Sequence, residues 1–346
     1  MSDEHPRILI VKLSSFGDVL HALPTLEALR DLYPEGRLTW LVEAAYAPLL
    51  EKHPALDEVW RAPRLRPGQI FSSANPTLIA GLVRHLRAHR FDVVIDLQGL
   101  LKSAVWVALA RGARKVGYDR TREGSYRVLS ERVDPFDREA HAVRRYLNLA
   151  QYLGAPVNPP RFRLGLGATI NVSHLLPGGE TRGLAVLHPG ARWPSKLWPP
   201  NSWAQLGDWL SREHGLRVAI TGSRADQALS QEILRLMQEP VIDLAGHTSL
   251  PELAAVLRRA RLAVTTDTGA MHLAAALGTP VAALFGPTAP WRTGPFGEGH
   301  EIVRLALDCS PCFKRRCPAP RCLMDLAPEL AQAACENILF PVEING

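Results

Sequence analysis

Several residue types and motifs are scarce or absent in this sequence, and their absence narrows the class of protein. Five cysteines in 346 residues are too few for a disulfide scaffold. Aromatic residues make up only 7% of the chain and no named RNA- or DNA-binding motif occurs, which argues against a nucleic-acid partner. P-loop, serine-hydrolase elbow and zinc-protease helix motifs are also missing. We therefore do not expect a hydrolase.

Long hydrophobic runs are missing as well. The polar stretch from Met1 to Arg7 shows no signal peptide and leads straight into an apolar run. The longest uncharged run, residues 268–291, is interrupted by prolines and glycines, and we interpret it as buried core rather than a membrane span. With 47% hydrophobic residues, the chain is expected to be soluble, globular and large enough for two domains.

Short β-branched runs alternate with amphipathic stretches, which is typical of parallel sheets covered by helices. A Pro- and Gly-rich stretch separates two such halves. The predicted fold class is α/β, with two Rossmann-like, doubly wound domains facing a cleft. The expected divisions are an N-terminal domain (1–160), a linker (161–183) with at most one strand (161–166), a C-terminal domain (184–325) and a final helix (326–346) that could pack back on the N-terminal domain. The predicted strands are 8–13, 38–42, 58–61, 93–97, 115–118, 184–188, 217–221, 241–244, 262–266 and 281–285.

The segment LAVTTDTGAMHLAAALGTPVAALFGPT, residues 262–288, is the most informative part of the chain. An apolar run ends at Asp267, a turn passes through Thr268 and Gly269, and a helical stretch follows. Free N–H groups of a helix N-terminus suit a phosphate, and a carboxylate suits sugar hydroxyls. Ligands of doubly wound sheets bind outside the carboxyl ends of the strands. This segment therefore predicts a nucleotide-sugar site.

Two further turns in the second half follow predicted strands. In the first, Arg192 and Lys196 would neutralise a diphosphate, although both could simply be solvated surface cations. In the second, Asp226 is placed to hold ribose hydroxyls, or to serve as the N-cap of the helix that follows. Both alternatives stay open from the sequence.

The first predicted strand ends in the turn Ser14-Ser15-Phe16-Gly17-Asp18, and a helix is expected from near Val19 toward Leu32. A carboxylate at this position could take a proton from an acceptor hydroxyl, which makes Asp18 a candidate general base. Lys12, on the same strand, could orient this carboxylate or bind phosphate. The alternative is that Asp18 only caps the helix.

Four motifs in order resemble those of the bacterial lipopolysaccharide-core heptosyltransferases. The two end signatures are ILIVKLSSFGDVLHALP at 8–24 and DTGAMHLAAALGTPVAALFGPT at 267–288. Between them, IDLQGLLKSA at 95–104 and the segment 121–123 are similar to the first heptosyltransferase of that family in particular. Together the motifs cover the chain from residue 8 to about 290 at the expected spacing.

This resemblance implies a GT-B fold, an ADP-heptose donor in the C-terminal domain and a lipid A-linked Kdo acceptor in the N-terminal domain. It also implies inversion at the anomeric carbon, with Asp18 as catalytic base and without a metal or other cofactor. The enzyme would be cytoplasmic and peripheral on the inner face of the inner membrane. The implied donor-binding residues are Arg192, Lys196, Asp226, Asp267, Thr268, Gly269 and His272, and the implied acceptor-binding residues are Lys12, Ser14, Ser15, Gly17, Gln98, Arg120 and Arg122.

Other functions fit the same motifs. The near alternative is the second heptosyltransferase, or transfer of another sugar on the same fold. Alternatives from different classes are a nucleotide-sugar epimerase of the same architecture, or a non-catalytic nucleotide-sugar-binding protein if Asp18 is only a helix cap.

The net charge of +6 and the pI near 9.2 favour an acidic partner, such as an anionic membrane surface or a phosphorylated substrate. Seven basic and three acidic side chains lie within residues 111–132, and Arg61, Arg64 and Arg66 form a second basic group. Arginine forks suit carboxylates and phosphates, so we expect both groups to meet the acceptor and to attract the enzyme to the membrane.

A cysteine-containing tail follows the last strand. Cys309, Cys312, Cys317 and Cys322 could in principle wrap one zinc ion, but only one CxxC pair occurs. We expect reduced thiols and no metal. The tail sequence CSPCFKRRC also resembles that of heptosyltransferases like the second one.

Overall fold

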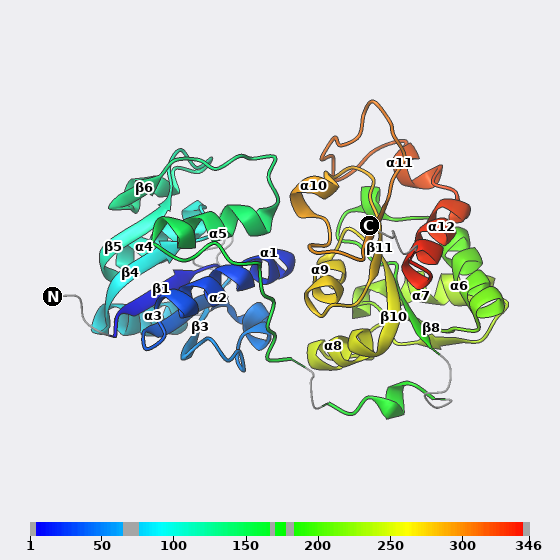
Figure 1. Ribbon diagram of the computed structural model, residues 1–346, viewed down its shortest axis with the longest axis horizontal. Coiled ribbons are helices and arrows are strands. Elements are labelled where there is room, and N and C mark those ends of the chain that lie inside the picture. Colours follow the sequence, from blue (N-terminus) through cyan, green and yellow to red (C-terminus); the bar gives the residue numbers. More distant parts are fainter. Residues whose placement is uncertain (1–4, 65–75, 167–169, 178–182, 342–346) are drawn as a thin grey trace. The chain divides into compact units, whose positions relative to one another are not determined.

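The protein consists of two compact units, Met1–Gly165 and Leu166–Gly346, each built on its own sheet (Figure 1). This computed structural model describes residues 5–64, 76–166, 170–177 and 183–341. Both sheets have six strands, all of them parallel and flanked by helices, so the predicted fold class is confirmed. The division after residue 165 falls within the expected linker, of which residues 167–169 and 178–182 lie outside the described part.

The first sheet has the doubly wound strand order, in which the chain builds outward from the centre in one direction and then in the other. Its strands are β1 (Arg7–Val11), β2 (Arg37–Glu43), β3 (Glu58–Ala62), β4 (Arg90–Asp96), β5 (Arg111–Tyr118) and β6 (Glu131–Val133). They lie in the order β3-β2-β1-β4-β5-β6. The edge strand β6 was not predicted, because its residues, ERV, contain two charged side chains and no apolar run.

The second sheet repeats this order. Its strands are β7 (Leu184–His188), β8 (Arg217–Ile220), β9 (Val241–Asp243), β10 (Ala260–Thr266), β11 (Val281–Leu284) and β12 (Glu301–Val303). They lie in the order β12-β11-β10-β7-β8-β9. The short edge strand β12 was likewise not predicted. Central strands of both sheets are buried on both faces, which explains why they read as continuous apolar runs.

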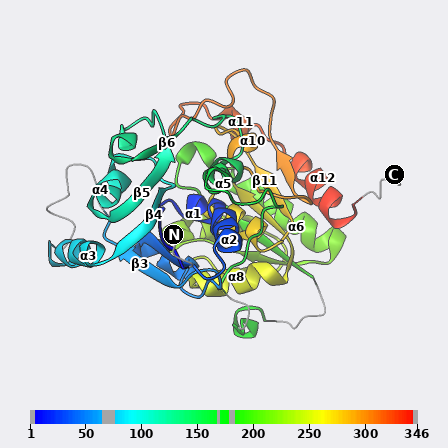
Figure 2. The ribbon, with the colours of Figure 1, turned by 60° about the vertical axis from the view of Figure 1, so that its left-hand side comes forward.

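The helices of the first unit cover both faces of its sheet. They are α1 (Phe16–His21), α2 (Leu23–Leu32), α3 (Pro76–Ala88), α4 (Leu101–Leu109) and α5 (Ala142–Tyr152), with 3-10 turns η1 (Ala44–Leu49) and η2 (Ser125–Val128). Figure 2 shows α3 and α4 on one face and α1, α2 and α5 on the other. The single helix expected from Val19 to Leu32 is wrong. A break at Ala22 separates α1 from α2, and Pro24 lies in the first turn of α2, where its missing N–H costs nothing.

The second unit is covered in the same way. Its helices are α6 (Pro200–His214), α7 (Gln227–Leu236), α8 (Leu250–Arg259), α9 (Gly269–Ala276), α10 (Pro290–Thr293), α11 (Arg321–Met324) and α12 (Pro328–Leu339), with 3-10 turns η3 (Ser173–Leu175), η4 (Pro194–Lys196) and η5 (Arg224–Asp226). α8 and α9 contact each other on one face, and α6, α7 and α12 lie on the other (Figure 1). The final helix was expected to pack back on the N-terminal domain; within its own unit, α12 packs on α6, β10, β11 and β12 and buries Ala331, Ala334 and Cys335.

Residues 161–166, expected to form a strand, have no regular secondary structure. Side chains from this stretch instead bind α2. The Arg163 guanidinium donates to both carboxylate oxygens of the buried Glu27, at 2.8 and 2.9 Å from Nε, and Arg161 pairs with Asp31. Ion pairs therefore attach the end of the first unit to its second helix.

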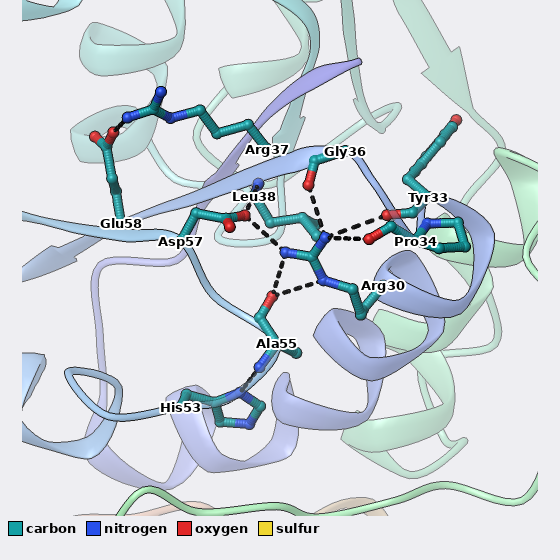
Figure 3. Close-up of polar contacts among 10 residues, drawn as sticks. All are labelled: Arg30, Tyr33, Pro34, Gly36, Arg37, Leu38, His53, Ala55, Asp57 and Glu58. Atoms are coloured by element: carbon teal, nitrogen blue, oxygen red, sulfur yellow. Dashed lines mark hydrogen bonds and ion pairs between the residues drawn. The ribbon is translucent and has the colours of Figure 1, made fainter. Parts of the chain in front are cut away.

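A half-buried arginine closes the turn between α2 and β2 (Figure 3). Arg30 donates hydrogen bonds to the carbonyl oxygens of Gly36 at 2.7 Å, Pro34 at 2.9 Å and Ala55 at 3.0 Å. Its guanidinium also lies 2.6 Å from Asp57, whose Oδ2 accepts from the backbone N–H of Leu38 at 2.7 Å. One side chain therefore joins the helix, the turn and the entry to β3.

Replacing this arginine should destabilise the first unit. Arg30→Met removes the donor of several carbonyl groups and the ion-pair partner of Asp57, which keeps the Leu38 N–H, and we expect a loss of about 2–3 kcal/mol in the free energy of unfolding. Arg37→Met is the matched control, because Arg37 is largely exposed and, among the described residues, its side chain pairs with Glu58 alone; its loss should stay below about 1 kcal/mol. Urea titrations of both variants measure the difference. Equal midpoints would show that the network contributes little.

Candidate active site

Most of the predicted site residues lie at the switch point of each sheet, where the strand order reverses, whereas Asp226 follows β8, and Arg120 and Arg122 follow β5. In the first unit this point lies between β1 and β4, and in the second between β7 and β10. The turns after these four strands hold Lys12 to Asp18, Gln98, His188 to Lys196, and Asp267 to Gly269. Crevices at such points are the usual ligand sites of doubly wound sheets. Each unit therefore carries its own candidate site.

Asp18 uses its two carboxylate oxygens for different purposes. It is the third residue of α1, and its Oδ2 accepts hydrogen bonds from the backbone N–H of Ser15 at 3.1 Å and from the Ser15 hydroxyl at 2.7 Å. This is a capping box, so Asp18 does cap α1, as the alternative interpretation of the sequence expected. The other oxygen, Oδ1, accepts from the hydroxyl of Tyr146 at 3.0 Å. Capping therefore occupies only one side of the carboxylate.

Tyr146, from α5, links Asp18 to the buried Lys12. Lys12 Nζ donates to the Tyr146 hydroxyl at 2.7 Å and to the carbonyl of Leu97 at 3.3 Å, and its side chain is 2% exposed. The three side chains form a chain of hydrogen bonds from ammonium to phenol to carboxylate. The sequence did not indicate Tyr146, because it lies 128 residues from Asp18 on an amphipathic helix whose apolar face explains its presence.

The charges of Lys12 and Asp18, together with burial, determine which of the three side chains carries a proton. Burial alone would raise the pKa of Asp18, but the charge of Lys12 and the hydrogen bonds from Ser15 outweigh it and hold this pKa well below its usual range. Burial lowers the pKa of Lys12, an effect that Asp18 and Asp96 oppose. Burial and the negative charge of Asp18 raise the pKa of Tyr146 well above its usual value. At neutral pH, Asp18 is therefore ionised and Tyr146 keeps the proton that it donates.

Other predicted acceptor-side residues shape the turn around Asp18. Gln98 Oε1 accepts from the backbone N–H groups of Leu13 and Ser14 at 3.1 and 3.0 Å. The ammonium of Lys102, which the sequence did not single out, contacts the Ser14 hydroxyl and lies 2.7 Å from the buried Glu43. Gly17 is buried within α1. Gln98 thus holds the first turn in place through its amide oxygen.

Several arginines of the two basic groups lie beside carboxylates, while Arg127 and Arg132 contact the ring of Tyr126. Arg114 lies 2.6 Å from Glu131 across β5 and β6, and Arg61 pairs with Glu51. Arg64 lies 4.0 Å from Glu43, and Arg66 is outside the described residues. The side chains of Arg120 and Arg122 are 75% and 86% exposed, and each lies beside its chain neighbour, Asp119 at 3.4 Å and Glu123 at 3.3 Å. Both arginines are therefore accessible to an acceptor.

In the second unit, Lys196 and Asp267 lie in direct contact. Lys196 Nζ is 2.6 Å from Asp267 Oδ2 and 3.1 Å from the Asp267 carbonyl oxygen. The hydroxyl of Thr288, after β11, donates to the same Oδ2 at 2.6 Å. From the sequence alone, Lys196 is expected to bind the diphosphate and Asp267 the sugar hydroxyls. The structure brings the two groups to one place at the carboxyl end of β10.

Asp226 lies against the turn after β7. Its Oδ2 accepts from the backbone N–H and hydroxyl of Ser223 at 2.7 and 2.6 Å, which is the capping box of η5. A Cβ added at Gly190 would come within 2.5 Å of the Asp226 carboxyl carbon, so the close approach requires glycine. Burial lowers the pKa of the neighbouring His188 to about 4, although Asp226 opposes this shift. His188 is therefore neutral, and its Nδ1 lies 3.0 Å from the Thr221 hydroxyl.

The N-terminus of α9 presents the remaining predicted donor-side residues. Thr268 is the N-cap and Gly269 the first helical residue, while His272 lies one turn further on. The Thr268 hydroxyl is buried without a hydrogen-bond partner in the described part of the chain. Arg192 is exposed, and no described carboxylate pairs with it. The N–H groups of α9, a free hydroxyl and Arg192 are groups that suit an anion.

The cysteine tail offers no evident metal site. Cys309, Cys312, Cys317 and Cys322 are free thiols, and within the described residues no group of three or more His, Cys, Asp or Glu side chains is arranged to hold a metal ion. Burial, the largest effect, raises the pKa of Cys322, which therefore remains a thiol at neutral pH. Among the helices of the described residues, none is both long and apolar enough to cross a membrane.

Two doubly wound units, each with a site at its switch point, are the architecture of GT-B glycosyltransferases. The chain belongs to glycosyltransferase family 9, the heptosyltransferases, whose family model matches residues 79–323. It is 33% identical to lipopolysaccharide heptosyltransferase 1 of Pseudomonas aeruginosa over 98% of this chain and 96% of that protein. The structure is similar to that of the Escherichia coli heptosyltransferase WaaC with ADP, with a TM-score of 0.79 and 27% identity over 96% of this chain and 99% of the other.

A second solved relative is the Escherichia coli ADP-heptose lipopolysaccharide heptosyltransferase II. Its TM-score is 0.75 and its identity 25%, over 96% of this chain and 98% of that one. The predicted enzyme class is confirmed by these findings: the chain is a heptosyltransferase of lipopolysaccharide core synthesis.

Proposed function

We propose that this enzyme transfers heptose from ADP-heptose to a Kdo-lipid A acceptor, with inversion at the anomeric carbon. The observation that carries the proposal is the ionised carboxylate of Asp18 at the switch point of the first unit, held by Ser15 on one oxygen and by Tyr146 on the other. The Escherichia coli relative solved with ADP supports an ADP-activated donor, and the similarity to lipopolysaccharide heptosyltransferase 1 supports the first inner-core acceptor.

In this mechanism, Asp18 accepts the proton of the acceptor hydroxyl as its oxygen attacks the anomeric carbon. The bond from that carbon to the ADP oxygen breaks, and ADP leaves with the electron pair. Lys196, Arg192 and the N–H groups at the start of α9 stabilise the departing diphosphate, so charge neutralisation comes from protein cations and dipoles. Asp226, Asp267, Thr268, Gly269 and His272 complete the donor site in this proposal.

The acceptor would bind to the first unit. The Lys12, Ser14, Ser15 and Gly17 region surrounds Asp18, and the exposed Arg120 and Arg122 are suited to carboxylates and phosphates of an anionic lipid. Because such an acceptor is embedded in a bilayer, we propose that the enzyme works as a peripheral protein at the cytoplasmic face of the inner membrane.

Tyr146 should act as a positioning residue for Asp18. Tyr146→Phe keeps the ring but removes the hydroxyl between Lys12 and Asp18, and we expect kcat to fall about tenfold with the donor KM unchanged. A hydrogen bond to a carboxylate lowers its pKa, so its removal should raise the pKa of Asp18. The acid limb of the pH–rate profile should therefore move to higher pH.

Tyr152→Phe, on the same helix, is the matched control for this variant. The Tyr152 hydroxyl only reaches Glu131, at 3.4 Å, and lies outside the Asp18 network. We expect its rate and pH profile to match the wild type. An unchanged acid limb in Tyr146→Phe would contradict a positioning role, even if kcat fell.

Transfer of labelled heptose tests the proposed function directly. Purified enzyme is incubated with labelled ADP-heptose and Kdo-lipid A, and the label is followed into lipid together with the anomeric configuration of the product. Labelled lipid with inverted configuration is the expected result. If labelled heptose enters the lipid only when the acceptor already carries one heptose, the enzyme is the second heptosyltransferase. Altered ADP-heptose without transfer would indicate an epimerase, and binding without any product a non-catalytic protein.

A further inference from the structure

Two sets of hydrogen bonds attach the cysteine tail to the candidate donor site. The buried hydroxyl of Ser195 donates to the Lys314 carbonyl at 2.7 Å, next to the backbone contact from Ser195 to Arg315 at 3.4 Å. Upstream, the backbone N–H groups of Cys312 and Phe313 donate to the Pro287 carbonyl at 3.1 and 2.7 Å. Ser195 adjoins Lys196, and Pro287 adjoins Thr288. The tail is therefore attached on both sides of the Lys196–Asp267–Thr288 cluster.

This attachment brings a second cation to the ring that Lys196 contacts. The Lys196 ammonium lies 4.5 Å from the ring centre of Trp193, and the Arg315 guanidinium carbon lies 5.5 Å from the same centre. Arg315 is exposed, and the described residues offer it no carboxylate partner and accept none of its side-chain N–H groups. The π face of the indole orients the guanidinium of Arg315, and this contact leaves all five N–H donors of the guanidinium available.

We propose that Arg315 is a donor-binding residue, which binds the diphosphate of the nucleotide sugar beside Lys196. The inference rests on the proposed function for the identity of the ligand. A nucleoside diphosphate carries more than one negative charge, whereas the charge of Lys196 is already shared with Asp267. An unpaired guanidinium can bind two phosphate oxygens at once through its fork. This role of Arg315 requires neither a metal nor a disulfide in the tail.

Calorimetric titration of the full-length protein with ADP tests the inference, with Arg316→Gln as the matched control. Arg316 is the next residue and is also exposed, and among the described residues it makes no contact with the cluster. We expect Arg315→Gln to weaken ADP binding about tenfold, and Arg316→Gln to leave it near the wild-type value. Arg315→Lys should fall between the two, because it restores the charge without the fork.

The salt dependence of the same titrations separates direct binding from a structural effect. Loss of a cation that touches phosphate should flatten the dependence of ADP affinity on salt, whereas a distorted loop should weaken binding equally at all salt concentrations. Equal ADP affinities for Arg315→Gln and Arg316→Gln, or an unchanged salt slope, would overturn the inference. Failure of the wild type to bind ADP would instead overturn the proposed donor, and the role of Arg315 with it.

Discussion

Asp18→Asn is expected to lower turnover by about 10²- to 10⁴-fold, because the amide keeps the shape of the side chain but cannot accept the acceptor's proton. ADP affinity should stay near the wild-type value, since Asp18 and the proposed donor site belong to different units. Initial rates at saturating donor and acceptor, together with ADP titration, measure both quantities. A variant that keeps more than about half of wild-type turnover would leave Asp18 only its capping role.

Ser15→Ala separates capping from basicity in this experiment. It removes one hydrogen bond to the same carboxylate and weakens the capping box, but leaves the base in place. Its turnover should therefore fall far less than that of Asp18→Asn, even if its thermal stability falls more. If the two variants lose turnover in proportion to their loss of stability, the effect comes from folding and not from proton transfer.

Lys196→Ala should produce the largest loss on the donor side. It removes the ammonium proposed to receive the departing diphosphate, and a hydrogen bond between charged groups is worth about 1.5–3 kcal/mol. We expect ADP and ADP-heptose to bind about ten- to a hundredfold more weakly. Turnover should also fall, because charge on the leaving group increases in the transition state. Calorimetry with both ligands and initial-rate measurements provide the test.

Asp267→Asn is the matched variant for Lys196→Ala. Lys196 and Asp267 are 2.6 Å apart, so neutralising the carboxylate frees the ammonium for phosphate. ADP should therefore bind at least as tightly as in the wild type, while ADP-heptose loses the contact proposed between Asp267 and the sugar. Equal losses of ADP affinity in the two variants would refute the separate roles given to these residues.

The sequence was sufficient to predict the strands and the turns of both switch points. Buried parallel strands appear as apolar runs such as ILIV and LAVTT, and polar residues follow directly where such a strand ends. Because the turns after β1, β4, β7 and β10 follow strands of this kind, Asp18, Gln98, Lys196 and Asp267 could all be placed at carboxyl ends. Edge strands β6 and β12 were missed because their residues, ERV and EIV, each begin with a glutamate and form no clear apolar run, whereas the equally short β9 leads into the apolar Leu244 and Ala245.

Contacts between distant residues were beyond this reasoning. Tyr146 meets Asp18 because α5 packs beside α1, and no local pattern reports which face of a helix meets which turn. Arg315 lies beside Trp193 because Ser195 donates hydrogen bonds to the backbone carbonyls of Lys314 and Arg315. Every residue has such a carbonyl, so the sequence gives no sign of this contact. For residues 111–132, the sequence shows the charge but not which charges are paired. Arg114 pairs with Glu131 because β5 and β6 are neighbouring strands.

The contact between Gly190 and Asp226 has a consequence for the divergence of this family. Any side chain at position 190 would occupy the volume of the Asp226 carboxylate, so the two positions are not free to vary independently. Lineages that acquire a larger residue at 190 should also have lost the acid at 226, or shifted the turn that bears it. Paired substitution at these two positions would then mark branches whose enzymes lack the ribose contact proposed for Asp226.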